Sequence, residues 1–254
     1  MARMHHPMRH GLVSAAFAVA VAAGLPAPAR ADAIDDSLEN LNQRNIAFSV
    51  QEFIDLVGRN DYENVRVFLQ AGMDPNTLRF GVPVLLEASM RGYTDTVKVL
   101  LEGGANPRLK NERSWTALHL AVFFSHKEVV EALLERGAEV SAKTEYGLTP
   151  LHFAIQERNV EIAEILFRKG ASPTVKSRSG VSGLTIAVDL NEKPLVKLME
   201  SHGYGPQMKA LRQQYAEEKA AAEREADKRS KEVAKKFKDQ MGAATGGRRS
   251  GAEE

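Results

Sequence analysis

Apolar residues occur in two short helical stripes, and the pair of stripes repeats every 33 residues along the chain. In the clearest copy, Leu151, Ala154 and Ile155 follow helical spacing, and a second stripe occupies residues 162–166. The same two stripes appear one period earlier, over residues 118–134. Helices this short cannot bury an apolar face alone, so the pattern predicts a stack of similar units.

Local signals mark where each predicted helix begins and ends. Thr149 is a good N-cap, and Pro150 follows at the first helical position, where its missing N–H costs nothing. We expect Asn159 to break the first helix and Gly170 to end the second, because glycine readily adopts a positive φ. Residues 172–180 are polar and rich in turn formers, which predicts an exposed, hairpin-like finger.

The glycine that closes each unit gives the number of units, since it returns with a spacing of 32 or 33 residues at Gly72, Gly104, Gly137, Gly170 and Gly203. The predicted units are residues 49–77, 78–110, 111–143, 144–176 and 177–204. The outer two depart most from the pattern, as expected of capping repeats with one face in water. Ser49 and Glu52 form a predicted capping box that places the start of the array.

Two of these units carry a recognisable motif. Residues 149–154 read T-P-L-H-F-A, and residues 116–121 read T-A-L-H-L-A. Together with the Leu-Leu-x-x-Gly-Ala type of ending, this pattern resembles the ankyrin repeat over residues 49–204. In unit two the histidine is replaced by Leu86, which puts one hydrogen bond in doubt. The resemblance implies an α-solenoid of antiparallel helix pairs with projecting fingers, and protein binding without chemistry.

Composition changes sharply after the last repeat. Residues 205–241 are rich in Ala, Glu, Lys and Arg and predict one long, solvated helix, followed by a disordered tail at 242–254. The apolar residues of this helix are too sparse for a continuous heptad seam, which favours a solvated helix. A coiled coil and a partner-binding helix are the alternative interpretations. The predicted fold class is all-α: an ankyrin-repeat α-solenoid of about five helix-turn-helix repeats with a charged C-terminal helical extension.

The N-terminus has the pattern of a secretory signal peptide over residues 1–31, with cleavage expected after Ala31. Basic residues precede an apolar run at 11–25, which is shorter than the ~20 residues of a membrane anchor, the alternative interpretation. Residues 32–48 form a lead-in to the repeats. The chain has no cysteine for lipidation or a disulfide. We therefore expect a periplasmic or secreted protein that is held together by packing.

The net charge of the chain limits the class of partner that it can bind. Removal of residues 1–31 takes away three arginines and no acid, so 31 Lys and Arg face 33 Asp and Glu, a formal charge of −2. A near-neutral chain argues against a nucleic-acid partner. We expect a protein or peptide partner, no stable membrane insertion after signal cleavage, and a monomer.

The search for catalytic chemistry returns no candidate. His119 and His152 occupy equivalent positions of adjacent units without clustered carboxylates, which indicates a structural role, each imidazole bonding to a neighbouring turn. His126 falls at a predicted inter-helix turn and has the same interpretation. The sequence has no phosphate loop and no nucleophile in a recognisable setting. We predict no enzyme activity, no cofactor and no metal.

A partner-binding surface is predicted where the finger tips and the outward side of the first helices line a concave groove. Trp115, the only tryptophan, falls in this set with several exposed aromatic and arginine residues of the kind that dominate interfaces. The alternative is that Phe123 and Phe124 close gaps between adjacent first helices. The set comprises Arg79, Phe80, Met90, Arg91, Glu112, Arg113, Trp115, Phe123, Phe124, Glu145, Tyr146, Gln156, Glu157 and Arg178, with Asp189 at the same register.

The predicted function is an exported, non-enzymatic scaffold that binds a protein or peptide partner in this groove, as an accessory or regulator of an envelope protein. Two alternatives stay open. One is a secreted effector that binds a host protein, and the other is an envelope enzyme with an unrecognised site.

Overall fold

The computed structural model describes residues 27–246, and the side chains of residues 32–236. Contacts divide the chain after His202 into two units, which are described separately. Of the predicted signal peptide, residues 1–26 lie outside the described residues, and so do residues 247–254 of the predicted tail.

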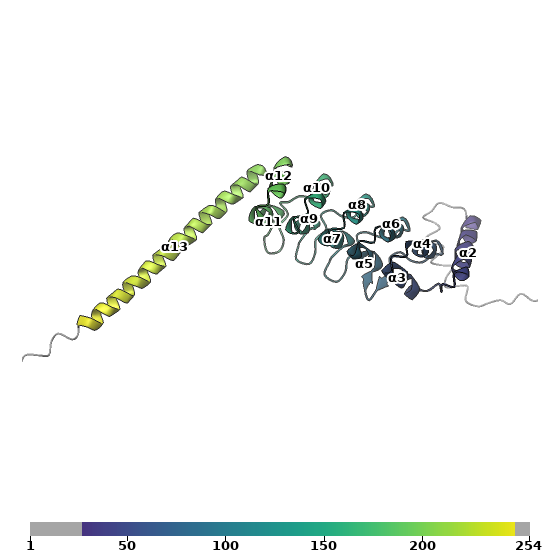
Figure 1. Ribbon diagram of the computed structural model, residues 1–254, viewed down its shortest axis with the longest axis horizontal. Helices are drawn as coiled ribbons and strands as arrows, with labels where there is room; N and C mark the ends of the chain where they lie inside the picture. Colours follow the sequence, from purple (N-terminus) through teal and green to yellow (C-terminus); the bar gives the residue numbers. More distant parts are fainter. Residues whose placement is uncertain (1–26, 247–254) are drawn as a thin grey trace, which may run out of the picture. The chain divides into compact units, whose positions relative to one another are not determined.

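The first unit contains an N-terminal helix and five helix pairs within its described residues, arranged as a row of first helices and a row of second helices (Figure 1). Each helix packs on the equivalent helix of the next pair. The N-terminal helix is α2 (Ala27–Gln43). The first helices are α3 (Val50–Gly58), α5 (Val84–Arg91), α7 (Ala117–Phe123), α9 (Pro150–Gln156) and α11 (Gly183–Leu190). The second helices are α4 (Tyr62–Gln70), α6 (Thr94–Glu102), α8 (Lys127–Glu135), α10 (Val160–Arg168) and α12 (Lys193–Ser201). The predicted all-α repeat solenoid is confirmed.

The helix starts follow the predicted capping chemistry. The Oγ of Ser49 accepts a hydrogen bond from the Glu52 backbone N–H at 3.1 Å and caps the start of α3. The second bond of the predicted capping box is not formed among the described residues, because the Glu52 carboxylate faces Arg59 instead, at 3.8 Å. Pro150 is the first residue of α9, as expected. Asn159 differs from its predicted role: its side chain accepts the Ile162 N–H at 3.0 Å, so it caps the start of α10 instead of breaking α9.

The turns between paired helices depend on one backbone position per unit. The residue there has a positive φ in all five units, although only one of the five is glycine: Asn60, Gly92, Ser125, Arg158 and Asn191. The five positions are spaced 32 or 33 residues apart. The break after α9 is therefore made at Arg158, where the sequence gives no warning because arginine is rare in this conformation.

Small residues allow the first helices to approach one another. The alanine of the repeated motif is fully buried in four successive units, as Ala88, Ala121, Ala154 and Ala187. Their short side chains face the contacts between neighbouring helices, where a larger group would hold the helices apart. The complete burial of these alanines fits a requirement for small side chains at the helix contacts.

A finger connects each helix pair to the next, and the unit-two finger is a true hairpin. Strand β1 (Leu78–Arg79) pairs antiparallel with β2 (Val82–Pro83). Phe80 and Gly81 form its two-residue turn, and both have a positive φ, as in a type I′ turn. In the later fingers the backbone N–H groups of Asn111, Thr144 and Ser177 donate to a carbonyl four residues on, at 2.8–3.0 Å.

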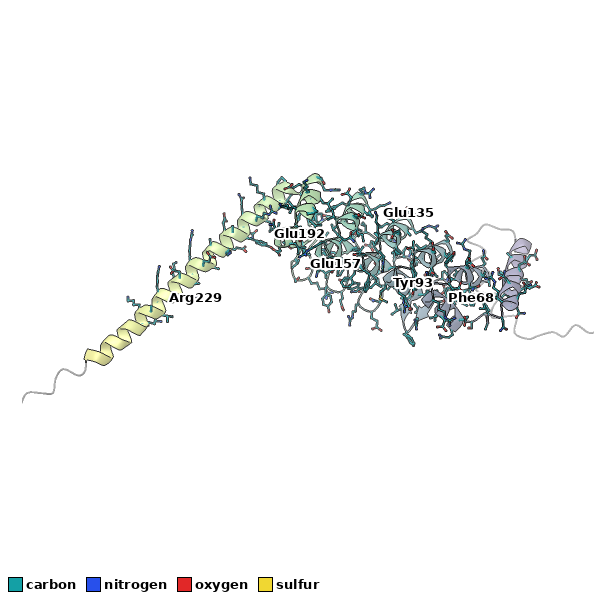
Figure 2. The ribbon with its side chains drawn as sticks, in the orientation of Figure 1. Phe68, Tyr93, Glu135, Glu157, Glu192 and Arg229 are labelled. Atoms are coloured by element: carbon teal, nitrogen blue, oxygen red, sulfur yellow. The ribbon has the colours of Figure 1, made fainter. Side chains whose placement is uncertain are left out.

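Helix α2, which the sequence pattern did not mark, begins at Ala27 in the predicted signal peptide and ends at Gln43 in the lead-in. Helix α2 packs against α4, and Leu41 is buried at 1% exposure. Phe68 of α4, which is labelled in Figure 2, packs against two other rings. Its ring centroid lies 5.1 Å from that of Phe48 and 5.9 Å from that of Phe53. Helix α2 is rich in Asp and Asn, so the sequence shows no apolar stripe that would predict it. By packing on α4, it covers the end of the first repeat.

The second unit contains the long helix α13 (Gly205–Gly246). It continues past Met241, the predicted end, through Gly242 and two alanines, because a single glycine inside a helix costs only about 1 kcal/mol. Ion pairs with helical spacing support its surface, including Lys231 Nζ to Asp227 Oδ2 at 2.6 Å and Arg229 Nε to Glu225 Oε1 at 3.5 Å.

Candidate partner-binding surface

The predicted residues occupy the finger tips and the C-terminal ends of the first helices. Three of them are half-buried: Arg79, Trp115 and Glu145. The others are exposed: Phe80, Met90, Arg91, Glu112, Arg113, Phe123, Phe124, Tyr146, Gln156, Glu157, Arg178 and Asp189. We call the fingers and these helix ends together the finger surface.

Two aromatic side chains stand at finger tips, at the same register and two units apart. Phe80 is 94% exposed, and Tyr146 is 61% exposed. Phe80 has a φ of 50°, in a region that a bulky side chain occupies only at a cost. Burying these rings against a partner would gain apolar contact that water does not provide.

A salt-bridge cluster holds the base of the unit-two finger. Glu87 of α5 accepts from Arg79 Nη1 at 2.8 Å and from Arg91 Nη2 at 3.1 Å. The Arg79 guanidinium also lies 5.8 Å from the centre of the Phe80 ring. A hydrogen bond to Tyr93, together with the Glu87 charge, raises the pKa of Arg91. Both arginines are thus engaged within the chain, which leaves Phe80 as the group that this finger offers to a partner.

Trp115 packs inside the array and joins two units. Its ring centroid lies 4.8 Å from Phe153 of α9 and 5.7 Å from Phe123 of α7, in an edge-on contact. Phe153 is buried, and the motif did not single it out because its position varies between units. Phe123 is 38% exposed and also meets Phe153 at 5.8 Å. Trp115 is therefore a packing residue, and Phe123 both fills a gap and faces solvent.

Backbone hydrogen bonds fasten neighbouring finger tips together. The Glu145 N–H donates to the Arg113 carbonyl at 3.1 Å, and the Arg178 N–H donates to the Tyr146 carbonyl at 2.9 Å. Gly147 allows this approach, since a Cβ there would lie 3.1 Å from the Arg178 nitrogen. The fingers of units three to five are thus fixed at the spacing of the repeats.

The two motif histidines also link adjacent units. His119 Nδ1 accepts the Thr116 N–H at 3.2 Å, so the ring proton lies on Nε2, which faces the Leu148 carbonyl of the next finger at 3.3 Å. His152 repeats the arrangement with Thr149 and Val181. Burial lowers the pKa of His119 to about 4 and lowers that of His152 in the same direction. Their structural role is confirmed.

One repeated feature of the finger surface was missed at the sequence level. Lys110, Lys143 and Lys176 occupy the same register in three successive fingers, and all three are exposed. The next residue in each finger, Asn111, Thr144 or Ser177, points inward and closes the turn with its side chain. The signal in the sequence is the 33-residue spacing of the three lysines, which lie between the helices and the finger tips.

Comparisons with known proteins match the repeat pattern. A family model for ankyrin repeats in three copies matches residues 54–144 and, in a second placement, residues 85–177. Over residues 54–177 the array is a stack of ankyrin repeats. Ankyrin repeats are generally protein–protein interaction modules, and proteins made of them are typically non-enzymatic scaffolds.

Two curated ankyrin-repeat relatives come from Danio rerio. The Notch-regulated ankyrin repeat-containing protein B is 38% identical over 49 residues, and protein A of the same name is 37% identical over 49 residues. Each match covers 19% of this chain and 44% of the relative. The chain thus spans less than half the length of these relatives, and the likeness supports the repeat fold alone.

His126 shows a further link between ankyrin units. Its Nε2 lies 3.0 Å from the Met90 carbonyl at the end of α5, and a Cβ on Gly92 would collide with its ring. One unit earlier, Tyr93 donates to the Gly58 carbonyl at 3.4 Å from the equivalent position. Both side chains satisfy helix-end carbonyls of the preceding unit, which confirms the structural interpretation of His126.

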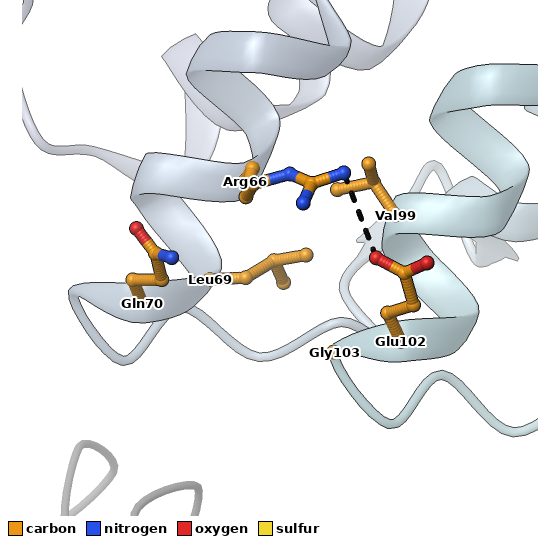
Figure 3. A pocket seen from close by; sticks show the side chains of 6 residues that line it. All are labelled: Arg66, Leu69, Gln70, Val99, Glu102 and Gly103. Carbon is orange, nitrogen blue, oxygen red and sulfur yellow. Dashed lines mark ion pairs between the residues drawn. The ribbon is translucent and has the colours of Figure 1, made fainter.

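Two hollows of the ankyrin array lie on the row of second helices. One, of about 220 Å³, lies between α4 and α6, where Arg66 Nη2 faces Glu102 Oε2 at 3.6 Å (Figure 3). The other, of about 170 Å³, lies between α6 and α8. None of the predicted partner-binding residues lines either hollow. A partner that uses the predicted residues would bind an open surface instead of a pocket.

Among the residues that the structure describes, no group of three His, Cys, Asp or Glu side chains is arranged to hold a metal ion. Within the same residues, no helix is both long enough and apolar enough to cross a membrane.

Proposed function

We propose that this chain is an exported, non-enzymatic ankyrin scaffold that holds a protein or peptide partner on its finger surface. The observation that carries the proposal is the pair of exposed aromatic tips, Phe80 and Tyr146, on fingers of one rigid array. Phe80 occupies a backbone conformation that favours glycine or asparagine, so its ring is present at a cost in stability. Such a cost is typical of residues kept for binding.

The proposed setting is the cell envelope. The N-terminal pattern favours export, and the absence of cysteine suits a domain that folds without disulfides. In this setting the scaffold would act as an accessory or regulator of another envelope protein.

Export is tested on the full chain expressed with its leader. We expect the recovered protein to have the intact mass of residues 32–254 and to appear in the periplasmic fraction. Recovery from the culture medium would favour the secreted effector, and an uncleaved chain in the cytoplasm would contradict export.

Partner binding is tested by affinity capture from an envelope extract. The wild type is compared with a Phe80→Asn, Tyr146→Asn double variant, which removes both aromatic tips. Trp115 stays intact because it packs on Phe153. Tyr62→Asn on α4 is the control, since Tyr62 is also exposed but lies on a second helix. We expect a partner held by the wild type and the control and lost by the double variant. A partner retained equally by all three proteins would refute the finger surface.

A further inference from the structure

The side chains of the three repeated finger lysines are unpaired among the residues that the structure describes. For Lys110, Lys143 and Lys176, the structure gives no ion pair or side-chain hydrogen bond with any residue that it describes. Among the described residues, some cations on the second helices pair with carboxylates, as Lys127 Nζ does with Glu161 Oε2 at 3.0 Å, while others such as Lys98 do not. The three finger lysines are distinguished by their common register in successive repeats, and we call them the lysine ladder.

The fingers as a group are basic although the whole chain is nearly neutral. Residues 74–83, 106–116, 139–149 and 172–182 contain seven Lys and Arg against four Asp and Glu, a net charge of +3. Besides the ladder, Arg113 and Arg178 are exposed in the same fingers, and neither takes part in an ion pair among the described residues. An excess of unpaired positive charge on one edge selects for a negatively charged partner.

The spacing of the ladder suits an extended chain. Its three lysines are one repeat apart, and the backbone bonds from Glu145 to Arg113 and from Arg178 to Tyr146 fix the fingers that carry them. Neighbouring packed helices lie about 8–10 Å apart. A peptide in the extended polyproline II conformation has three residues per turn and advances about 3.1 Å per residue, so every third side chain lies on the same face, about 9 Å farther along. Carboxylates at every third residue would meet successive lysines.

We propose that the lysine ladder receives an extended acidic segment of a protein partner, with a carboxylate at about every third residue. Tyr146, at the tip of the middle finger, supplies an apolar contact between the charged ones. This inference rests on the proposed function, since it names the class of partner that the finger surface binds.

The test uses the full chain and a fluorescent peptide made of four Glu-Ser-Thr repeats. Binding is measured by fluorescence anisotropy at about 50 mM and about 300 mM NaCl. The Debye length is shorter at the higher salt concentration, so attraction between exposed charges is weaker there. The ladder variant is Lys110→Gln, Lys143→Gln and Lys176→Gln. The matched control replaces Lys98, Lys169 and Lys197, which are exposed on second helices or directly after one and make the same charge change.

We expect the ladder variant to bind the peptide about tenfold more weakly than the wild type, as the loss of three exposed ion pairs implies. The control variant should stay within about twofold of the wild type, and higher salt should narrow the difference. Equal weakening in both variants would overturn the proposal, because the attraction would then come from net charge alone.

Two further probes test spacing and chemistry. A peptide of the same composition with its glutamates adjacent should bind more weakly than the spaced peptide, and equal binding would overturn the register. A single-stranded oligonucleotide of the same charge should compete poorly. Equal competition would show a surface for polyanions in general and would overturn the acidic protein segment.

The capture experiment separates this inference from the proposed function. Suppose that the Phe80 and Tyr146 double variant loses the partner, while the ladder variant binds the peptide as tightly as the wild type. This outcome would overturn the ladder alone. Suppose instead that the ladder variant binds the peptide more weakly, while the partner is captured equally by the wild type, the double variant and the Tyr62 control. This outcome would overturn the aromatic tips alone.

Discussion

The imidazole rings of His119 and His152 are held neutral by their place in the fold. Each Nδ1 accepts a backbone N–H at the start of its own helix, and each Nε2 faces a carbonyl of the next finger. A proton on Nδ1 would face a donor instead of an acceptor. These two side chains therefore make the contact between units sensitive to acid.

The folded state of His119 has a pKa near 4, below the ordinary value of 6.5. As the pH falls from about 7, the unfolded chain binds a proton first, so the free energy of unfolding decreases until the folded state is also protonated, near pH 4. The lost stability is about 3 kcal/mol. His119→Leu, which copies Leu86 of unit two, should flatten this part of the pH profile in urea unfolding. An unchanged slope would contradict the assignment.

The Phe80 backbone makes a second prediction at this scale. Phe80→Asn should raise the free energy of unfolding by about 1 kcal/mol, because asparagine tolerates a positive φ and the exposed ring loses little packing. Thermal unfolding measures the change. Tyr146→Asn is the control, since Tyr146 has the same register but not a positive φ, and it should bring no gain. A melting temperature of Phe80→Asn below that of the wild type would show that the Phe80 backbone is not strained.

At the scale of elements, the fingers depend on close contact between their backbones. Gly147 has a φ of 75°, and a Cβ there would meet Arg178 N at 3.1 Å and Ser177 Cα at 3.3 Å. Gly180 has a similar φ of 83°, yet nothing lies within 4 Å of its Cβ position. Substitution of Gly180 therefore tests the cost of a positive φ alone, whereas substitution of Gly147 also tests the cost of a steric clash with the next finger.

Gly147→Ala should therefore destabilise the array more than Gly180→Ala. Both changes carry the cost of a positive φ, about 1 kcal/mol, and only the first also forces two fingers apart. Urea unfolding of the two variants measures the difference. Equal losses would mean that the finger contact adds nothing to stability.

The elements also show what sequence patterns reveal and what they miss. The capping residues and closing glycines predicted the helix pairs, because these signals act within a few residues. The positive φ of Arg158 was missed because arginine is rare in this conformation, and helix α2 was missed because it packs on α4, which is distant in the sequence. The predicted set of binding residues fell on exposed positions except Arg79, Trp115 and Glu145, whose half-burial comes from packing that the sequence does not encode locally.

At the scale of the whole molecule, an array of repeats responds to damage near the place where it occurs, because each unit contacts only its neighbours. Helix α2 covers one end of the row through α4. Stability is therefore expected to vary along the array instead of being shared evenly.

Leu41→Ala tests this expectation, since Leu41 is buried and belongs to α2. The change should cost about 2–4 kcal/mol locally. Hydrogen exchange should become faster in α3 and α4 and stay unchanged in α9 and α10. Exchange that rises equally along the whole array would show a single cooperative unit and contradict the prediction.

The bonds between neighbouring fingers have a consequence for how this surface can evolve. They join the backbone of Arg113 to Glu145 and that of Tyr146 to Arg178, and no side chain takes part in them. Tip residues can therefore be exchanged by mutation while the distance between the tips stays the same. A lineage that carries this scaffold is free to acquire a new binding preference through single substitutions, without first rebuilding the frame that presents them.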